Sequence, residues 1–221
     1  MLVLRKIDQL TQGDHFYIDK SSDCYYFAEY PSGDNPENKS NPIYSLIHNI
    51  KKPMNRQSLP EWQYKRRDLA NCSETLKKLF QKSDDIGEFT LIPMPPSKTK
   101  MDPAYDPRII QILEGLKSNF EDCDVRELLY TLNNMQSSHE SNIRPSIEAI
   151  VQNFGIDSQL LIGCRPKVII FDDVLTTGAH FCAAKRKILE VMPSAKIIGY
   201  FIARRVLPQI DDFKDDWLKE I

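Results

Sequence analysis

The sequence predicts an α/β fold in which a parallel sheet is flanked by helices in a Rossmann-like core, with a small β-rich region at the N-terminus. Apolar runs of strand length alternate with helical patterns from about residue 89 onward. Two of these runs, 167–173 and 195–203, are almost continuously apolar, which is typical of strands covered on both faces. The chain has 221 residues, of which 41 % are hydrophobic and only 8 are Gly, so it can bury a large core.

Aromatic residues indicate strands near the N-terminus. Residues 15–20 and 24–30 are apolar and aromatic, and the turn-forming segment 21–23 separates them, which predicts a β-hairpin. The polar stretch 31–42 is predicted to be a loop. We therefore expect an N-terminal hood over residues 1–57 and the α/β core over residues 58–221.

The core is predicted to begin with a long helix. Ser58 is followed three residues later by Glu61, with Pro60 between them, and this capping box predicts a helix that runs to about Lys82. The elements expected after it are a buried strand at 89–93, a helix at 107–120, a short strand near 127–131 and a helix at 145–154.

The C-terminal half has the clearest pattern of alternating elements. The predicted order is a strand at 167–173, a helix at 178–191, a strand at 195–203 and a closing acidic helix at 211–220. In parallel sheets of this kind, ligands bind at the carboxyl ends of the strands. We therefore look for functional residues directly after the apolar runs.

Charge and cysteine content exclude several classes. The chain has 29 Lys and Arg against 31 Asp and Glu, a net charge of −2, which argues against a main role on nucleic acid or a membrane surface. No apolar run approaches the roughly 18 residues of a membrane helix, and no leader pattern opens the sequence, so we expect a cytoplasmic protein. Its five cysteines lack CxxC spacing, which predicts neither a zinc ribbon nor a disulfide framework.

The segment from Val168 to Ala179 is the most informative part of the sequence. Two carboxylates, Asp172 and Asp173, stand at the carboxyl end of a buried strand, and a short loop ending in Gly178 opens the next helix. Free backbone N–H groups and the positive end of the helix dipole would hold a phosphate there. Two adjacent acids would repel that phosphate, so we expect them to face neighbouring sugar hydroxyls, which can donate to both.

Simpler explanations account for only part of this segment. An acid and a Thr before a helix can serve as caps, but capping does not require two acids, two threonines and a Gly in one loop. The phosphate-binding patterns GxxxxGK[ST] and GxGxxG do not occur, and Val174 stands where a second aspartate of a D-x-D motif would be.

The segment resembles the PRPP loop of type I phosphoribosyltransferases, an apolar strand followed by Asp-Asp, two variable residues and Thr-Thr-Gly. The resemblance implies that Asp172 and Asp173 bind the ribose hydroxyls of 5-phosphoribosyl-1-pyrophosphate (PRPP). It also implies a Mg²⁺ ion that these two acids contact indirectly, through ligand or water. The residues that would hold the 5′-phosphate are Val174, Leu175, Thr176, Thr177, Gly178 and Ala179.

A second segment, residues 91–109, is similar to the pyrophosphate loop of the competence-type (ComF-like) branch of that family. Its proline-rich start leads into Ser97, Lys98, Lys100 and Arg108, which follow a predicted strand and would lie at the sheet edge. Residues 201–205 resemble the closing strand of that branch, and the segment that ends at Arg144 resembles its flexible stretch. The similarity covers about residues 90–205, without the zinc ribbon often found at the start of that branch.

The loop also departs from the usual pattern in its Pro95-Pro96 pair. For Lys100 and Arg144, an ordinary surface position fits the sequence as well as a ligand contact does. We expect residues 97–107 and 133–146 to form a mobile rim that closes on pyrophosphate, because the second stretch is rich in Asn, Ser and Gln.

The expected function is transfer of the phosphoribosyl group of PRPP to a nitrogenous acceptor, with release of pyrophosphate. Asp172, Asp173 and Lys98 are the expected catalytic residues, and the hood would select the acceptor. The alternative is a sensor or assembly module that binds PRPP or a nucleotide without turnover, as an effector in a bacterial defence complex or as a homo-oligomer.

Other charged residues are assigned to structural roles. The four histidines lack metal-ligand spacing, and only His180 is placed to contact the site. The basic pairs and triplets at 51–52 and 65–67 are expected on solvated faces.

Overall fold

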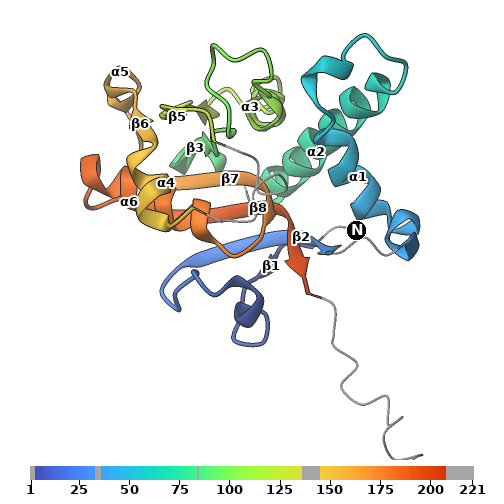
Figure 1. Ribbon diagram of the computed structural model, residues 1–221. Helices are drawn as coiled ribbons and strands as arrows, with labels where there is room; N and C mark the ends of the chain where they lie inside the picture. The colour runs from blue at the N-terminus through green and yellow to red at the C-terminus, as the bar shows by residue number, and fades with distance from the viewer. Residues whose placement is uncertain (1–2, 33–35, 84, 136–144, 208–221) are drawn as a thin grey trace, which may run out of the picture.

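The computed structural model describes residues 3–32, 36–83, 85–135 and 145–207 and has an α/β architecture (Figure 1). Its main sheet has the strand order β1-β2-β8-β7-β3-β4, and every neighbouring pair is parallel except β1 with β2. The predicted fold class, a parallel sheet flanked by helices, is confirmed at this level. The strands are β1 (Arg5–Lys6), β2 (Asp23–Pro31), β3 (Phe89–Pro93), β4 (Asp124–Val125), β7 (Lys167–Leu175) and β8 (Lys196–Val206).

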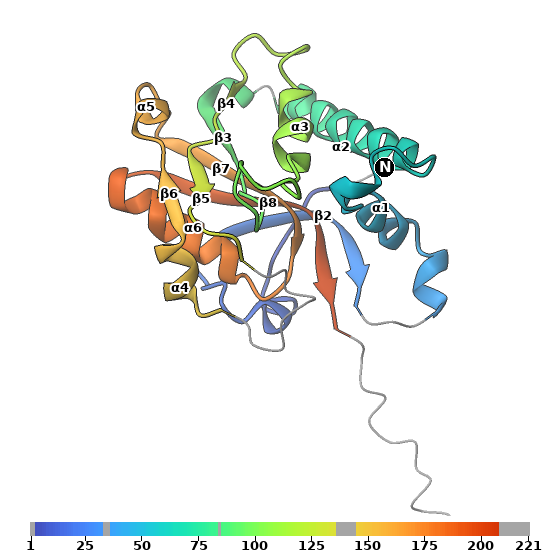
Figure 2. The ribbon, with the colours of Figure 1, turned by 45° about the horizontal axis from the view of Figure 1, so that its top comes forward.

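Helices cover both faces of the sheet (Figures 1 and 2). Because successive side chains of a strand point to opposite faces, Val168 and Ile170 of β7 enter one hydrophobic core, while Ile169 and Phe171 enter the other. The first core includes helices α4 and α6, and the second includes α1, α2 and α3. These helices are α1 (Pro42–Ile50), α2 (Trp62–Ser83), α3 (Arg108–Glu114), α4 (Ile147–Gln152) and α6 (Ala179–Val191).

A second, two-stranded sheet lies beside the main one. It pairs β5 (Leu129–Thr131) with β6 (Phe154–Ile156) in antiparallel fashion. The short helix α5 (Ser158–Leu161) follows β6. The described residues also form short 3-10 helices, which are η1 (Gln12–His15), η2 (Pro36–Ser40), η3 (Met54–Arg56) and η4 (Ile86–Glu88).

The predicted N-terminal hairpin is wrong. Residues 16–20 form turns after η1, and the antiparallel partner of β2 is β1. His15 and Ile18 are buried three residues apart, which is the spacing of a turn and not the two-residue spacing of a strand. On its other side β2 pairs in parallel with β8, so this N-terminal strand belongs to the main sheet.

Several predicted boundaries also differ from the structure. The predicted loop 31–42 contains η2 and ends where α1 begins at Pro42, capped by the side chain of Asn41, whose Oδ1 accepts from the N–H of Ile43 at 2.8 Å. Helix α2 begins at Trp62, so Ser58 does not cap it.

The remaining differences concern length. Helix α3 ends at Glu114, six residues earlier than predicted, and single turns follow it. The predicted helix 145–154 is limited to α4, and the predicted strand near 127–131 belongs to the second sheet. The elements predicted at 89–93, 178–191 and 195–203 are confirmed within a few residues, and β7 is two residues longer than predicted. The closing helix predicted at 211–220 lies outside the described residues.

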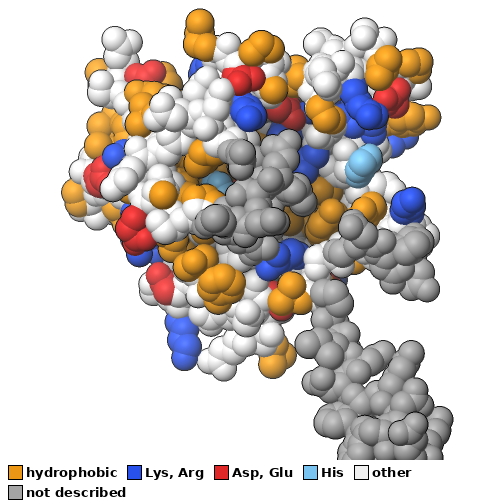
Figure 3. All heavy atoms as spheres, viewed as in Figure 1, with side chains coloured by type: hydrophobic (Ala, Val, Ile, Leu, Met, Phe, Trp, Pro, Cys, Tyr) orange, Lys and Arg blue, Asp and Glu red, His pale blue; other side chains and the backbone are white. Residues whose placement is uncertain are grey.

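The surface viewed in Figure 3 carries interspersed Lys, Arg, Asp and Glu side chains. This matches the near balance of charges in the sequence. Within the described residues, no helix is long and apolar enough to cross a bilayer.

Close packing at the centre of the sheet makes Gly199 of β8 sensitive to substitution. A Cβ atom there would lie 2.8 Å from the rings of Phe181 and Phe201 and 3.0 Å from the sulfur of Cys24. We expect Gly199→Ala to lower the free energy of unfolding by about 1–3 kcal/mol, because the core must shift. Urea unfolding measures the change. The control is Gly13→Ala, since a Cβ there meets no atom within 4 Å and should cost nothing.

Candidate functional site

The loop between β7 and α6 is a cradle of backbone donors. Gly178 has φ +89°, and a Cβ atom there would lie 2.6 Å from the side chain of Ile18, so only glycine fits. Within the described residues, the N–H groups of Thr176, Thr177 and Gly178 donate to no protein acceptor. Together with the start of the 13-residue helix α6, these donors can hold an anion.

The two acids at the end of β7 lie in different environments. Asp173 is buried, with only 5 % of its side chain exposed. Its carboxylate accepts from the Arg108 Nε atom at 2.8 Å and lies 3.0 Å from the Lys51 Nζ atom. Asp172 is partly exposed, lines a pocket and accepts the N–H of Asp173 at 2.7 Å. One acid is thus held by cations, and the other is available to a ligand.

The same environments move the two pKa values apart. Burial and the neighbouring charge of Asp173 raise the pKa of Asp172 from 3.8 to about 7. Burial alone would also raise the pKa of Asp173, but Lys51 and Arg108 hold it below its usual range. Because the two carboxylates are adjacent and Asp173 stays charged, a proton or a hydrogen-bond donor at Asp172 reduces the repulsion between them.

Asp173 belongs to a network of alternating charges that joins four elements. Arg108, at the start of α3, also binds Asp106 at 3.0 Å, and Asp106 accepts from the Nζ atom of Lys65 of α2 at 2.7 Å. Lys51, at the C-terminal end of α1, is the remaining partner of Asp173. The side chain of Lys65 is only 1 % exposed, and its Nζ atom also donates to the carbonyl of Lys52 at 2.9 Å.

This network corrects the prediction that the basic residues at 51–52 and 65–67 lie on solvated faces. Lys52 and Lys65 are buried, and Lys51 binds Asp173. Only Arg66 and Arg67 are exposed as predicted. The sequence does not reveal these partners, because Lys51 and Asp173, like Lys65 and Asp106, are far apart in the chain. Lys65 does lie three or four residues from the buried Asp68 and Leu69, and this spacing places it on the buried face of α2.

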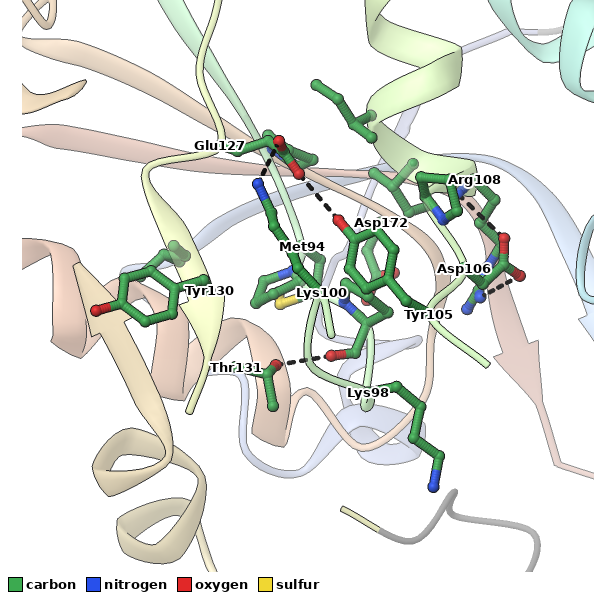
Figure 4. A pocket seen from close by; sticks show the side chains of 17 residues that line it. Met94, Lys98, Lys100, Tyr105, Asp106, Arg108, Glu127, Tyr130, Thr131 and Asp172 are labelled. Carbon is green, nitrogen blue, oxygen red and sulfur yellow. Dashed lines mark hydrogen bonds and ion pairs between the residues drawn. The ribbon is translucent and has the colours of Figure 1, made fainter. Parts of the chain in front are cut away.

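The structure brings several of the predicted basic residues to one pocket beyond the end of β3 (Figure 4). Lys98, Lys100 and Arg108 line this pocket together with Asp172. Lys100 binds Glu127 at 2.6 Å, and the Tyr105 hydroxyl donates to the same carboxylate at 3.0 Å. Within the described residues Lys98 forms no ion pair, and in Figure 4 its side chain points away from the labelled acids.

The loop that carries these residues is tied to the segment 131–135. The carbonyl of Pro96 accepts from the Thr131 hydroxyl at 2.7 Å, and the carbonyl of Ser97 accepts from the N–H of Met135 at 2.8 Å. Farther along the loop, the N–H of Thr99 donates to the Asn134 side chain at 2.9 Å. Ser97 does not line the pocket, and its contact is through the backbone.

Two of the other predicted contacts have different outcomes. Arg144, with most of the stretch 133–146, lies outside the described residues, so closure of the predicted rim stays a prediction. His180, in the first turn of α6, is partly exposed, and burial lowers its pKa while the charge of Asp173 opposes that shift. Among the described residues, however, no hydrogen bond or ion pair joins His180 to either acid of the pair.

In the part of the chain that the structure describes, no three His, Cys, Asp or Glu side chains form a group that could bind a metal ion. Asp173 already binds two cations, so Asp172 is the acid of the pair that could contact a further cation.

Comparison with known proteins gives no family for this chain. Neither a scan against models of protein families nor a search of curated proteins produced a match.

The acid pair predicts opposite effects for two similar substitutions. Asp173→Asn should lower the free energy of unfolding by about 2–3 kcal/mol, because it weakens a buried ion pair. Asp172→Asn should instead stabilise the protein by about 1–2 kcal/mol at pH 8, because it removes an ionised carboxylate whose folded pKa is raised.

The second effect has a defined pH dependence. A raised folded pKa means that the folded protein binds more protons than the unfolded chain between about pH 4 and pH 7, so wild-type stability falls as pH rises through this window. The gain from Asp172→Asn should therefore shrink towards pH 4. Thermal melting at several pH values tests this, with the exposed Glu121→Gln as control. Destabilisation of equal size by both Asp substitutions would contradict the separate roles.

Proposed function

We propose that this protein is a Mg²⁺-dependent phosphoribosyltransferase that transfers the phosphoribosyl group of PRPP to a nitrogenous acceptor. The observation that carries the proposal is the juxtaposition, at one end of β7, of an available carboxylate at Asp172 and the backbone donors of Thr176 to Gly178. A sugar phosphate presents hydroxyls and a phosphate a few bonds apart, and this edge offers partners for both.

The phosphate would be held by the β7–α6 loop. Its N–H groups need no counter-charge, and the start of α6 favours an anion. Gly178 allows this loop to pack closely against Ile18, because a Cβ atom there would lie 2.6 Å from the Ile18 side chain. The hydroxyl of the exposed Thr176 can add a further donor.

The ribose hydroxyls would be bound by Asp172. Its raised pKa shows that the carboxylate gains from any donor placed against it, and a diol supplies two. Asp173 contributes by fixing the backbone of its neighbour through Arg108 and Lys51. This assigns ligand binding to one acid of the pair and positioning to the other.

In the reaction, the bond between C1′ of the ribose and the pyrophosphate oxygen breaks, and pyrophosphate leaves with the electron pair. A new bond forms between C1′ and the acceptor nitrogen, which loses a proton. Lys98 would stabilise the charge that develops on the leaving pyrophosphate. A Mg²⁺ ion, held mainly by ligand oxygens and touched by Asp172 directly or through water, would supply further charge stabilisation.

The pairing of charges at the pocket supports a second candidate, a sensor that binds PRPP or a nucleotide without turnover. Lys100 is paired with Glu127, and Arg108 is paired with Asp106 and Asp173. Two of the three cations at the pocket are therefore already neutralised. A leaving group could use them only by replacing their acidic partners.

Ligand binding and turnover are tested together. The protein is incubated with PRPP, Mg²⁺ and pooled nitrogenous bases, and mass spectrometry detects ribosylated products, while thermal melting with PRPP and Mg²⁺ measures binding. We expect a product and a rise in melting temperature, because a ligand at 100 times its Kd stabilises by about 2.7 kcal/mol. Stabilisation without product would favour the sensor, and no stabilisation at millimolar PRPP would contradict both candidates.

The role of Lys98 gives a sharper prediction. Lys98→Ala should lower turnover by about 10- to 100-fold while leaving the affinity for ribose 5-phosphate, which lacks pyrophosphate, within about twofold. The control is Lys196→Ala, an exposed lysine at the opposite end of the sheet. If the two variants keep equal turnover, Lys98 has no part in the reaction.

A further inference from the structure

We infer that His15 is a positioning residue that aims the backbone donors of the β7–α6 loop at the ligand phosphate. This inference rests on the proposed function and extends it to a segment that the proposed chemistry leaves unused. It begins from two contacts between the N-terminal segment 12–18 and the loop. The His15 Nδ1 atom bonds to the carbonyl oxygen of Thr176, and the N–H of Tyr17 donates to the carbonyl oxygen of Thr177 at 3.0 Å.

These contacts fix where the loop N–H groups point. In a planar trans peptide the C=O of one residue and the N–H of the next point in opposite directions, and the described chain has no cis peptide bond. Holding the carbonyl oxygens of Thr176 and Thr177 against the N-terminal segment therefore turns the N–H groups of Thr177 and Gly178 away from it. Those are two of the donors that would receive the phosphate.

The rest of the segment is packed tightly enough to act as a support. Ile18 is 2 % exposed and lies where a Cβ of Gly178 would be. The Cys182 thiol, one turn into α6, donates to the carbonyl of Tyr17 at 2.8 Å. The Gln12 side chain donates to the carbonyl of Ile18 at 2.7 Å. The segment is thus anchored both to itself and to the first turns of α6.

His15 is better suited to this role than to filling space. Its ring is completely buried, and a carbonyl can only accept, so the proton must sit on Nδ1. The Nε2 atom is then buried without a partner among the described residues. An apolar side chain would avoid that cost but would leave the Thr176 carbonyl without its donor. Burial, together with the charge of Arg204, lowers the pKa of His15 and so favours the neutral ring.

Two isosteric substitutions separate positioning from packing. The Asn side chain places an N–H donor where His has Nδ1, one bond from Cγ, whereas Gln places its donor one bond farther, where His has Nε2. His15→Asn should therefore keep the bond to Thr176, and His15→Gln and His15→Leu should lose it. The control is His48→Gln, because His48 is exposed on α1.

The test measures the affinity of each variant for ribose 5-phosphate and for inorganic pyrophosphate by isothermal titration calorimetry, with thermal melting to confirm folding. We expect His15→Gln and His15→Leu to bind ribose 5-phosphate about tenfold more weakly than wild type, and His15→Asn within about threefold. Affinity for pyrophosphate, which would bind at the basic loop, should stay unchanged. If His15 has only a structural role, the affinities for both ligands should fall together, and they should fall most in the variants with the lowest melting temperature.

The outcomes distinguish this inference from the proposed function. If the wild-type protein binds ribose 5-phosphate and the folded His15→Gln variant binds it equally well, the positioning role is overturned and the proposed function stands. If His15→Leu fails to fold, the comparison of Asn with Gln decides. If the wild-type protein does not bind ribose 5-phosphate, the proposed function is overturned and this inference with it.

Discussion

The buried carboxylate of Asp173 connects the parts of this protein that form its candidate site. It binds Arg108 and Lys51, and through Asp106 the network reaches Lys65 inside α2, so one alternating chain of charges joins β7 to three helices. A buried ion pair gives little net stability, but removing one member leaves an uncompensated charge. The network therefore holds α1, α2 and α3 in one arrangement at the carboxyl edge of the sheet, where the neighbouring Asp172 and the basic loop lie.

The acid pair also shows how two identical side chains can take different roles. With its charge already compensated, Asp173 stays ionised and fixes the strand end, while Asp172 lines the pocket beside it with a raised pKa. A donor from a ligand relieves the repulsion between them more effectively than water does, because the site is partly desolvated. The loop that follows offers neutral backbone N–H donors. A lysine at the same place would be drawn into an ion pair with the two acids, whereas the neutral donors stay free to bind an anion.

Much of the core could be predicted from the sequence because its signals are local. The unit from β7 to α6 combines a continuous apolar run, turn residues and Gly178, and all of these act within one segment. The pairing of β2 with β8 joins residues 175 positions apart, and no local pattern specifies it, so the aromatic residues near β2 suggested a hairpin instead. Lys65 was misplaced for the same reason, since burial of a lysine depends on a distant partner such as Asp106.

The proposed function requires that the N–H groups of Thr176, Thr177 and Gly178 receive the phosphate of the ligand. Amide hydrogen exchange followed by NMR measures this most directly, because each of the three groups is read separately. With ribose 5-phosphate bound, exchange at these amides should slow by about tenfold or more, while exchange at the start of α5, a second helix N-terminus, stays unchanged. Binding that protects other amides and leaves these three unchanged would contradict the proposed phosphate site.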